Sequence, residues 1–329
     1  MLPTLRLRSI LNHFARPALT SSTAASPSTP KSPQFVSPIR RMSTSNKDET
    51  PRFPISEVPK TSKGPIRTAG MLVIGDEVLN GKTRDSNSNF LAKMAFDLGI
   101  ELKRIEVIAD DEAEIVEAVR RMHKNYDWVV TSGGIGSTHD DITYPSIAAA
   151  FEVPLEYHDE TIKRMEAFSK GRYNFQEQTE EQKTARLRMA LFPKGEYLFV
   201  QEDLWVPVVR MGGNVTIFPG IPALFERLVT GYASRFIELP PSSEKPYRVL
   251  VHTEMPESSI APFLTKLADR VKKEGIRVGS YPKIRAGVDV SLIGKDESRL
   301  LELAKEVEQE LKGTLLARGK IGEEEEVKK

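Results

Sequence analysis

The chain has 329 residues, a net charge of +1 and no cysteine. This length accommodates two compact domains plus tails, and the near-neutral charge provides no global basic field for nucleic-acid binding. The lack of cysteine excludes disulfides, thiolate nucleophiles and Cys-ligated zinc or iron–sulfur centres. No apolar run approaches the roughly 20 residues that would span a membrane.

The N-terminus has the composition of a targeting sequence. From Met1 to Lys47 there is no Asp or Glu, Ser and Thr are abundant, and apolar residues can form one helical face beside arginines. This pattern predicts a mitochondrial transit peptide over residues 1–45 and a matrix location. The alternatives are a disordered basic tail without an address, and a cytoplasmic form that starts at Met42. Residues 46–66, in a Ser- and Pro-rich stretch, are expected to be a disordered linker.

Strands and helices alternate in the next part of the chain. Gly99 lies just past one predicted helix, and Asp111 with Glu114 has capping-box-like spacing at the start of another. The alternation predicts an α/β fold, a three-layer sandwich with a mostly parallel sheet, whose ligands bind beyond the carboxyl ends of the strands. We expect strands at 68–74, 102–108 and 128–132, and helices at 85–98, 111–123 and 145–151.

The rest of the chain completes this domain and adds a smaller one. Residues 155–196 are polar and expected to be helical, and a hairpin around Gly212-Gly213 precedes a sharp turn and a helix that ends near Phe236. The first folded domain is thus predicted over 67–238. A small α+β domain of βαββα order follows over 245–318, and the acidic residues 319–329 are expected to be a disordered tail.

One glycine-rich loop is the strongest indication of function. Gly133, Gly134 and Gly136 follow an apolar strand, and Asp140 and Asp141 precede the next helix. Glycines let a backbone approach a phosphate closely, a helix N-terminus offers N–H groups to an anion, and paired carboxylates bind divalent cations. The alternative for both aspartates is helix capping. The loop matches neither a Walker A motif nor Gly-x-Gly-x-x-Gly.

Other residues can contribute to the same site. Asp76 and Glu77 follow the first strand and are either metal ligands or turn residues. His139 is a candidate acid, phosphate contact or metal ligand, with a structural role as the alternative. In the small domain, Lys283 and Arg285 either form a solvated strand edge or reach a diphosphate, and Glu257 is expected to cap a helix.

Three motifs together resemble a known family. Thr131–Thr143, Gly75–Gly81 and Phe218–Pro222 resemble the signatures of the molybdopterin-binding, MoaB/Mog-type domain. The resemblance implies catalytic Asp140, Asp141 and His139, and a metal site of Asp76, Glu77, Asp140 and Asp141. It implies phosphate contacts from Ser132, Gly133, Gly134, Gly136, Ser137, Thr138, Thr143 and Gly220, with Asp85, Asn87, Pro219 and Pro222 also in the cleft.

Within the family the chain is most similar to the CinA-type branch, which includes the N-terminal domain of eukaryotic bifunctional FAD synthases. Ser137 replaces the usual Pro, and the segment Leu204–Val209 stands where molybdenum-cofactor enzymes carry Ala-Pro-Gly, which argues against molybdopterin binding. No synthase or amidohydrolase domain follows before Lys329, so FAD synthesis is not expected.

The resemblance therefore implies a divalent-metal-dependent pyrophosphatase that hydrolyses FAD to FMN and AMP, or acts on ADP-ribose, with Mg, Mn or Co as cofactor. The alternatives are a molybdopterin-binding or adenylyl-transferring protein of molybdenum-cofactor assembly, and a non-catalytic flavin or nucleotide binder. The expected partners are a small nucleotide substrate and a second copy of the chain, with no nucleic acid and no membrane.

Overall fold

A computed structural model describes residues 51–58, 64–169, 178–284 and 286–327. The predicted transit peptide over 1–45 lies outside the described residues, so its prediction remains open. Among the residues described, no helix combines the length and apolar character needed to cross a membrane.

The larger domain is built on a mixed sheet of six strands in the order β2-β1-β3-β8-β7-β6. The first four strands are parallel, whereas β7 and β6 are antiparallel to their neighbours. The mostly parallel α/β sheet predicted from the sequence is thus confirmed. The strands are β1 (Thr68–Ile74), β2 (Glu101–Ile108), β3 (Trp128–Ser132), β6 (Glu196–Leu198), β7 (Val208–Met211) and β8 (Val215–Phe218).

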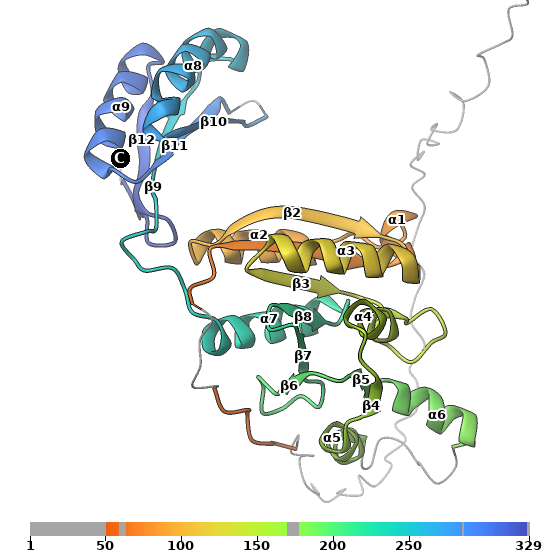
Figure 1. The fold of residues 1–329 in the computed structure, drawn as a ribbon. Helices are drawn as coiled ribbons and strands as arrows, with labels where there is room; N and C mark the ends of the chain where they lie inside the picture. The colour runs from red at the N-terminus through yellow and green to blue at the C-terminus, as the bar shows by residue number, and fades with distance from the viewer. Residues whose placement is uncertain (1–50, 59–63, 170–177, 285, 328–329) are drawn as a thin grey trace, which may run out of the picture. The chain divides into compact units, whose positions relative to one another are not determined.

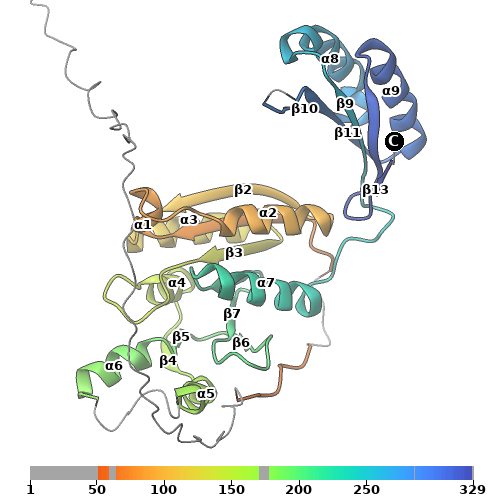
Figure 2. The same ribbon diagram turned by 180° about the vertical axis from the view of Figure 1, so that it is seen from behind.

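Helices cover both faces of this sheet, as a three-layer sandwich requires. Alternate residues of β1 face opposite sides: Met71 packs with α2 and α7, and Leu72 packs with α3 and α4. Figure 1 shows α3 and α4 on one face, and Figure 2 shows α2 and α7 on the other. The helices are α1 (Asp76–Leu79), α2 (Asn87–Asp97), α3 (Glu112–Asn125), α4 (Thr143–Phe151) and α7 (Pro222–Phe236).

The segment expected to be helical between 155 and 196 is only partly so. It contains α5 (Asp159–Ser169) and α6 (Glu180–Arg188), but β4 (Leu155–Tyr157) and β5 (Leu191–Pro193) pair into a separate two-stranded sheet. The pairing buries Phe192 completely. Strands this short carry too few residues to show a periodic pattern in the sequence.

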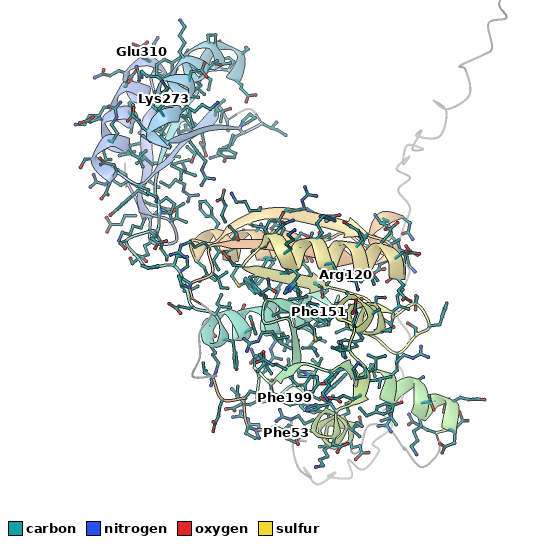
Figure 3. All side chains as sticks on the ribbon, in the orientation of Figure 1. Phe53, Arg120, Phe151, Phe199, Lys273 and Glu310 are labelled. Carbon is teal, nitrogen blue, oxygen red and sulfur yellow. The ribbon has the colours of Figure 1, made fainter. Side chains whose placement is uncertain are left out.

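Part of the expected linker also departs from the prediction of disorder. In residues 51–58, Phe53 N donates to Glu202 O at 2.8 Å, and Ser56 N donates to Phe199 O at 2.8 Å. The buried Arg164 guanidinium lies 3.5 Å from the Phe199 ring centroid and also donates to Pro54 O. Figure 3 labels Phe53 and Phe199 at this contact. The segment is thus hydrogen-bonded to the folded domain and packs beside Arg164.

The smaller domain is an antiparallel sheet with both of its helices on one face. Its strand order is β10-β11-β9-β12-β13, and α8 and α9 pack over Val249, Val251 and Val290. The elements are β9 (Tyr247–Thr253), α8 (Glu257–Val271), the 3-10 helix η2 (Lys272–Glu274), β10 (Arg277–Pro282), β11 (Val288–Gly294), α9 (Glu297–Glu310), β12 (Thr314–Lys320) and β13 (Glu325–Glu326).

This domain therefore has more strands than the predicted βαββα order. β12 pairs with β9 through Lys320, and β13 returns against β12, where a disordered acidic tail from 319 was expected. Glu324 forms an ion pair with Arg248 of β9 at 2.9 Å. The acidic composition of the tail is explained by such pairing along the sheet edge.

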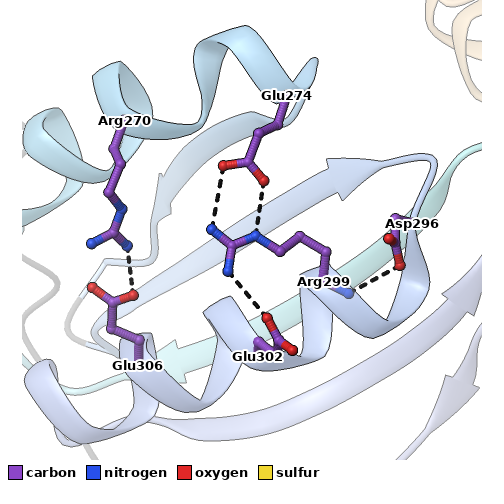
Figure 4. A network of polar contacts seen from close by, with 6 residues as sticks. All are labelled: Arg270, Glu274, Asp296, Arg299, Glu302 and Glu306. Carbon is purple, nitrogen blue, oxygen red and sulfur yellow. Dashed lines mark hydrogen bonds and ion pairs between the residues drawn. The ribbon is translucent and has the colours of Figure 1, made fainter.

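A surface ion-pair network joins the two helices of the smaller domain (Figure 4). Arg299 pairs with Glu274 at 2.8 Å and with Glu302 at 3.1 Å, and Arg270 pairs with Glu306 at 2.5 Å. Asp296 caps α9 by accepting from Arg299 N at 3.1 Å. Exposed pairs of this kind contribute little to stability, so the apolar contact beneath them holds the helices in place.

Because apolar contacts and not the exposed ion pairs hold these helices, two neighbouring substitutions in α9 should have different effects. Leu300 is fully buried, so Leu300→Ala should cost about 2–5 kcal/mol and raise the amide hydrogen-exchange rate of β9 and β11. Arg299→Gln is the matched control and should leave exchange in those strands almost unchanged. Equal effects of the two substitutions would contradict the account.

Candidate functional site

The site forms where four parallel strands end. The segments after β1, β3 and β8 meet at this edge of the sheet, because parallel strands present their carboxyl ends together. Gly133 N donates to Phe218 O at 3.2 Å, and Gly75 N donates to Ile108 O at 3.1 Å. These bonds connect the ends of neighbouring strands just before the chain turns into the loops.

Glycine is required by the packing of the loop after β3. Gly133 has φ of 108°, and a Cβ there would lie 2.1 Å from Ile74 O. A Cβ on Gly134, which has φ of 63°, would lie 2.3 Å from Thr143 Oγ1. Side chains at these positions would separate the loop from β1 and from α4.

Asp141 closes the loop rather than facing a ligand. Its carboxylate accepts from Gly136 N at 2.6 Å and from Thr138 N at 2.9 Å, and Thr138 Oγ1 also donates to it. A Cβ on Gly136 would lie 2.5 Å from the same carboxylate. Arg188 of α6 donates to Thr138 O at 2.9 Å from outside the loop. In this geometry Asp141 is a positioning residue, as capping aspartates are.

Thr143 and Ser132 are likewise engaged within the protein. The Thr143 hydroxyl is fully buried and donates to Gly133 O at 2.9 Å. Ser132 Oγ accepts from Asn87 Nδ2 at 2.9 Å and lies 3.4 Å from Pro219 O. Both hydroxyls were expected to contact phosphate, and that stays a prediction.

Asn87 and the turn before α7 form the floor of a small cleft. Asn87 Nδ2 also donates to Gly220 O at 2.9 Å, which fixes the amide orientation because a carbonyl can only accept. Asn87 Oδ1 is buried and has no partner, so it is the acceptor that a ligand or a water would satisfy. Asp85 caps α2 by accepting from Ser88 N at 3.0 Å.

The cleft has a volume of about 40 Å³. It brings together several residues that the sequence placed in the site, and it adds Arg84, which had no motif to indicate it. The predicted members that line it are Glu77, Asp85, Asn87, Ser132, Gly133, Gly220 and Pro222.

A group of carboxylates lies beside the loop, and it includes one that sequence analysis missed. Asp110 Oδ2 accepts from Asp76 N at 3.0 Å, at the end of β2. Burial raises the pKa of Asp110, and the nearby charges of Asp76, Glu77 and Asp140 raise it further. Asp110 comes after a predicted strand, as Asp76 and Asp140 do. This shared position in the sequence could have identified Asp110 as a candidate site residue.

Asp140 is exposed, as are Asp76 and Glu77, whereas Asp110 is half-buried. The pKa of Asp140 is lowered by hydrogen bonding within the loop and by the neighbouring His139. His139 and Asp140 are both exposed, and Ser137 is half-buried. The loop therefore presents an ionised carboxylate and an imidazole to solvent, next to the more buried Asp110.

The donor set fits a hard divalent cation. Carboxylate oxygens are the ligands that Mg²⁺ and Mn²⁺ prefer. The pKa of Asp110 is raised first by burial and then by nearby negative charge, which a cation would offset. Within the described ranges, no group of three or more His, Asp or Glu side chains is placed so that it could hold a metal ion as the side chains stand. The residues that would hold a cation are Asp76, Glu77, Asp110 and Asp140.

The candidate residues of the smaller domain have other partners. Lys283 Nζ pairs with Asp289 Oδ2 at 2.6 Å, a partner that neither expectation for Lys283, a solvated strand edge or a contact with a diphosphate, included. Glu257 Oε1 accepts from Ser280 Oγ at 3.1 Å, and α8 begins without a side-chain cap. Arg285 lies outside the described residues.

Asp110 gives a stability prediction whose sign follows from its pKa. Because folding raises that pKa, the ionised carboxylate destabilises the folded state, and this cost appears as pH rises through the folded pKa. Asp110→Asn keeps an acceptor for Asp76 N without the charge, so it should raise the thermal unfolding midpoint at about pH 7.5. The difference should shrink as the pH is lowered and wild-type Asp110 takes up a proton. A variant that is less stable than wild type at neutral pH would contradict this.

Two known protein families match this chain. The family described as "Probable molybdopterin binding domain" matches residues 70–237, and the family described as "FAD synthase, middle domain" matches residues 246–319. The first match covers the six-stranded sheet and its loops, and the second covers the smaller domain.

Several relatives carry the same arrangement. A "Probable FAD synthase" of Caenorhabditis elegans is 34% identical over 245 residues, which are 69% of this chain and 46% of that protein. A "CinA-like protein" of Anaeromyxobacter is 33% identical over 218 residues, 64% of this chain and 50% of that protein. The chain spans about half the length of these two relatives.

Among solved structures, the protein CinA from Thermoplasma acidophilum, described as of unknown function, is 27% identical. Its match has a TM-score of 0.44 and covers 51% of this chain and 97% of that one. The chain belongs to the molybdopterin binding domain family, carries an FAD synthase middle domain after it, and is related to CinA-like proteins and FAD synthases.

Proposed function

We propose that the chain is a divalent-metal-dependent pyrophosphatase that hydrolyses a dinucleotide diphosphate, FAD or ADP-ribose. The observation that carries this proposal is the position of Asp110 among Asp76, Glu77 and Asp140, beside a glycine loop. The phosphates of a substrate and these carboxylates are all negatively charged and repel one another. A cation held by the carboxylates would offset that repulsion. The relative named as a probable FAD synthase supports a flavin nucleotide as ligand.

The chain's own residues have separable roles in this reaction. Gly133 and Gly134 let the loop pack closely against Ile74 O and Thr143, while Asp141 and Thr143 hold the loop in that shape beside the proposed phosphate position. Arg84, at the rim of the cleft, provides a positive charge for the second phosphate. A bound divalent cation would stabilise charge on the diphosphate and lower the pKa of a water.

Proton transfer follows from the same arrangement. Water oxygen attacks one phosphorus and the P–O–P bond breaks, so that FAD yields FMN and AMP. The exposed His139, next to Asp140 in the loop, is placed to accept the proton from water and pass it to solvent. Asp140, with its lowered pKa, stays ionised and is suited to hold the cation.

Binding of molybdopterin, with or without adenylyl transfer, is the second candidate function, because the family match carries that description. Leu204–Val209, where Ala-Pro-Gly was expected for such enzymes, counts against it. A non-catalytic flavin or nucleotide binder remains the third. We also propose self-association and mitochondrial residence, the former from the family and the latter from the acid-free composition of the N-terminus.

The test is a substrate panel with the full chain. FAD, ADP-ribose and NADH are incubated with Mg²⁺, Mn²⁺ or Co²⁺, and AMP is quantified by chromatography. We expect metal-dependent release of AMP from FAD or ADP-ribose, and a loss on the order of 100-fold in kcat/KM for Asp140→Asn.

Asp159→Asn is the matched control, since Asp159 is an exposed aspartate at the start of α5 and lies in none of the site loops. It should retain wild-type activity. No metal-dependent AMP release, or an Asp140→Asn variant as active as wild type, would overturn the proposal. Tight molybdopterin binding without hydrolysis would favour the second candidate.

A further inference from the structure

The smaller domain contains a polar cluster that the proposed reaction does not use. Asp289 of β11 lies directly opposite His252 of β9 in the antiparallel register. Their neighbours Val251 and Val290 face α8 and α9, so the pair lies on the sheet face that these helices leave uncovered. Lys283, from the loop between β10 and β11, reaches the same carboxylate.

Asp289 connects the other two side chains. Its Oδ1 accepts from His252 Nδ1 at 2.7 Å, and its Oδ2 accepts from Lys283 Nζ at 2.6 Å. The side chain of Asp289 is only 10% exposed. Burial acts to raise the pKa of this carboxyl, but hydrogen bonds from Lys283 and His252 outweigh burial and lower it. Asp289 is therefore an ionised group that fixes two donors.

The contact with Asp289 determines what His252 offers a ligand. With Nδ1 engaged, Nε2 is the remaining polar atom of the ring, and it becomes an N–H donor when the ring is protonated. The ammonium of Lys283 has three hydrogens and uses one for Asp289, so two remain. Both side chains line a cavity of about 720 Å³.

The backbone around this cavity is held in place. Gly287 has φ of 75°, and a Cβ there would lie 2.0 Å from Thr253 O, so the loop after β10 is pressed against the end of β9. Lys283 N donates to Gly287 O at 2.8 Å across that loop. The backbone that carries the two donors therefore has its position before a ligand binds.

Other charged groups at the cavity affect whether it favours an anion. Glu254 and Glu257 also line it, but Glu257 is hydrogen-bonded to Ser280 of β10. α8 begins at Glu257, beside Pro256, without a side-chain cap, which adds partial positive charge at the same wall. When His252 is protonated, the cluster of His252, Lys283 and Asp289 carries one net positive charge.

We propose that this cavity is a binding site for a phosphate group, contacted by His252 Nε2 and Lys283 and positioned by Asp289. The site is separate from the glycine-loop cleft and does not depend on the proposed hydrolysis. Because protonated His252 is the better donor, binding should be stronger on the acid side of neutrality. The charged groups around His252 at the cavity are Asp289, Lys283, Glu254 and Glu257.

The test follows the imidazole signals of the full chain by NMR while inorganic phosphate or AMP is added, at about pH 6 and about pH 8. The chain has five histidines, and the spectrum of His252→Gln assigns the signal of His252. We expect the His252 signal to shift with phosphate, with weaker binding at the higher pH. A shift with AMP alone would also support the site and would assign a nucleotide rather than free phosphate as its ligand.

Lys283→Gln keeps the histidine and should weaken phosphate binding at this site by roughly 10-fold. Lys273→Gln is the control, because Lys273 is an exposed lysine of η2 that does not line the cavity. Figure 3 labels Lys273. No shift of the His252 signal with either probe, or equal affinity in Lys283→Gln and wild type, would overturn the proposal. A change in the glycine-loop cleft would leave this result unaffected.

Discussion

The backbone of Gly133 passes so close to the carbonyl of Ile74 that no side chain can lie between them. This contact joins the end of β3 to the end of β1, and the hydrogen bond from Gly133 N to Phe218 O joins it to β8. A Cβ on Gly220 would in turn lie 3.3 Å from Gly133 Cα. The loops that carry the candidate site are thus held together by main-chain proximity.

Around that contact the polar residues divide into two groups. Asp141 and Thr143 satisfy backbone groups within the loop, and they fix its shape. Asp76, Glu77 and Asp140 instead add negative charge near Asp110, whose pKa is raised first by burial and further by these neighbours. A protein that retains such repulsion at the carboxyl ends of its strands has a place where a positively charged group would be stabilising.

The alternation of apolar strands and helices was sufficient to predict the sandwich, because strands buried on both faces give continuous apolar runs such as Trp128–Ser132. The loop residues were predicted as a set, but their individual roles were not. Asp140 and Asp141 are adjacent and chemically identical, and only the hydrogen bonds of Asp141 distinguish them. Asp110 was missed because it follows its strand without a glycine motif. β12 was missed because its half-buried, partly charged sequence resembles a solvated tail.

The central claim is that the carboxylates around Asp110 hold a divalent cation next to the glycine loop. Electron paramagnetic resonance of Mn²⁺ measures free ion directly, so a titration of the full chain, with and without FAD or ADP-ribose, counts bound ions and gives their affinity. The account predicts one Mn²⁺ per chain, with binding weakened roughly 10-fold or more in Asp110→Asn and in Asp140→Asn. Mn²⁺ binding that is absent, or equally strong in both variants and wild type, would contradict it.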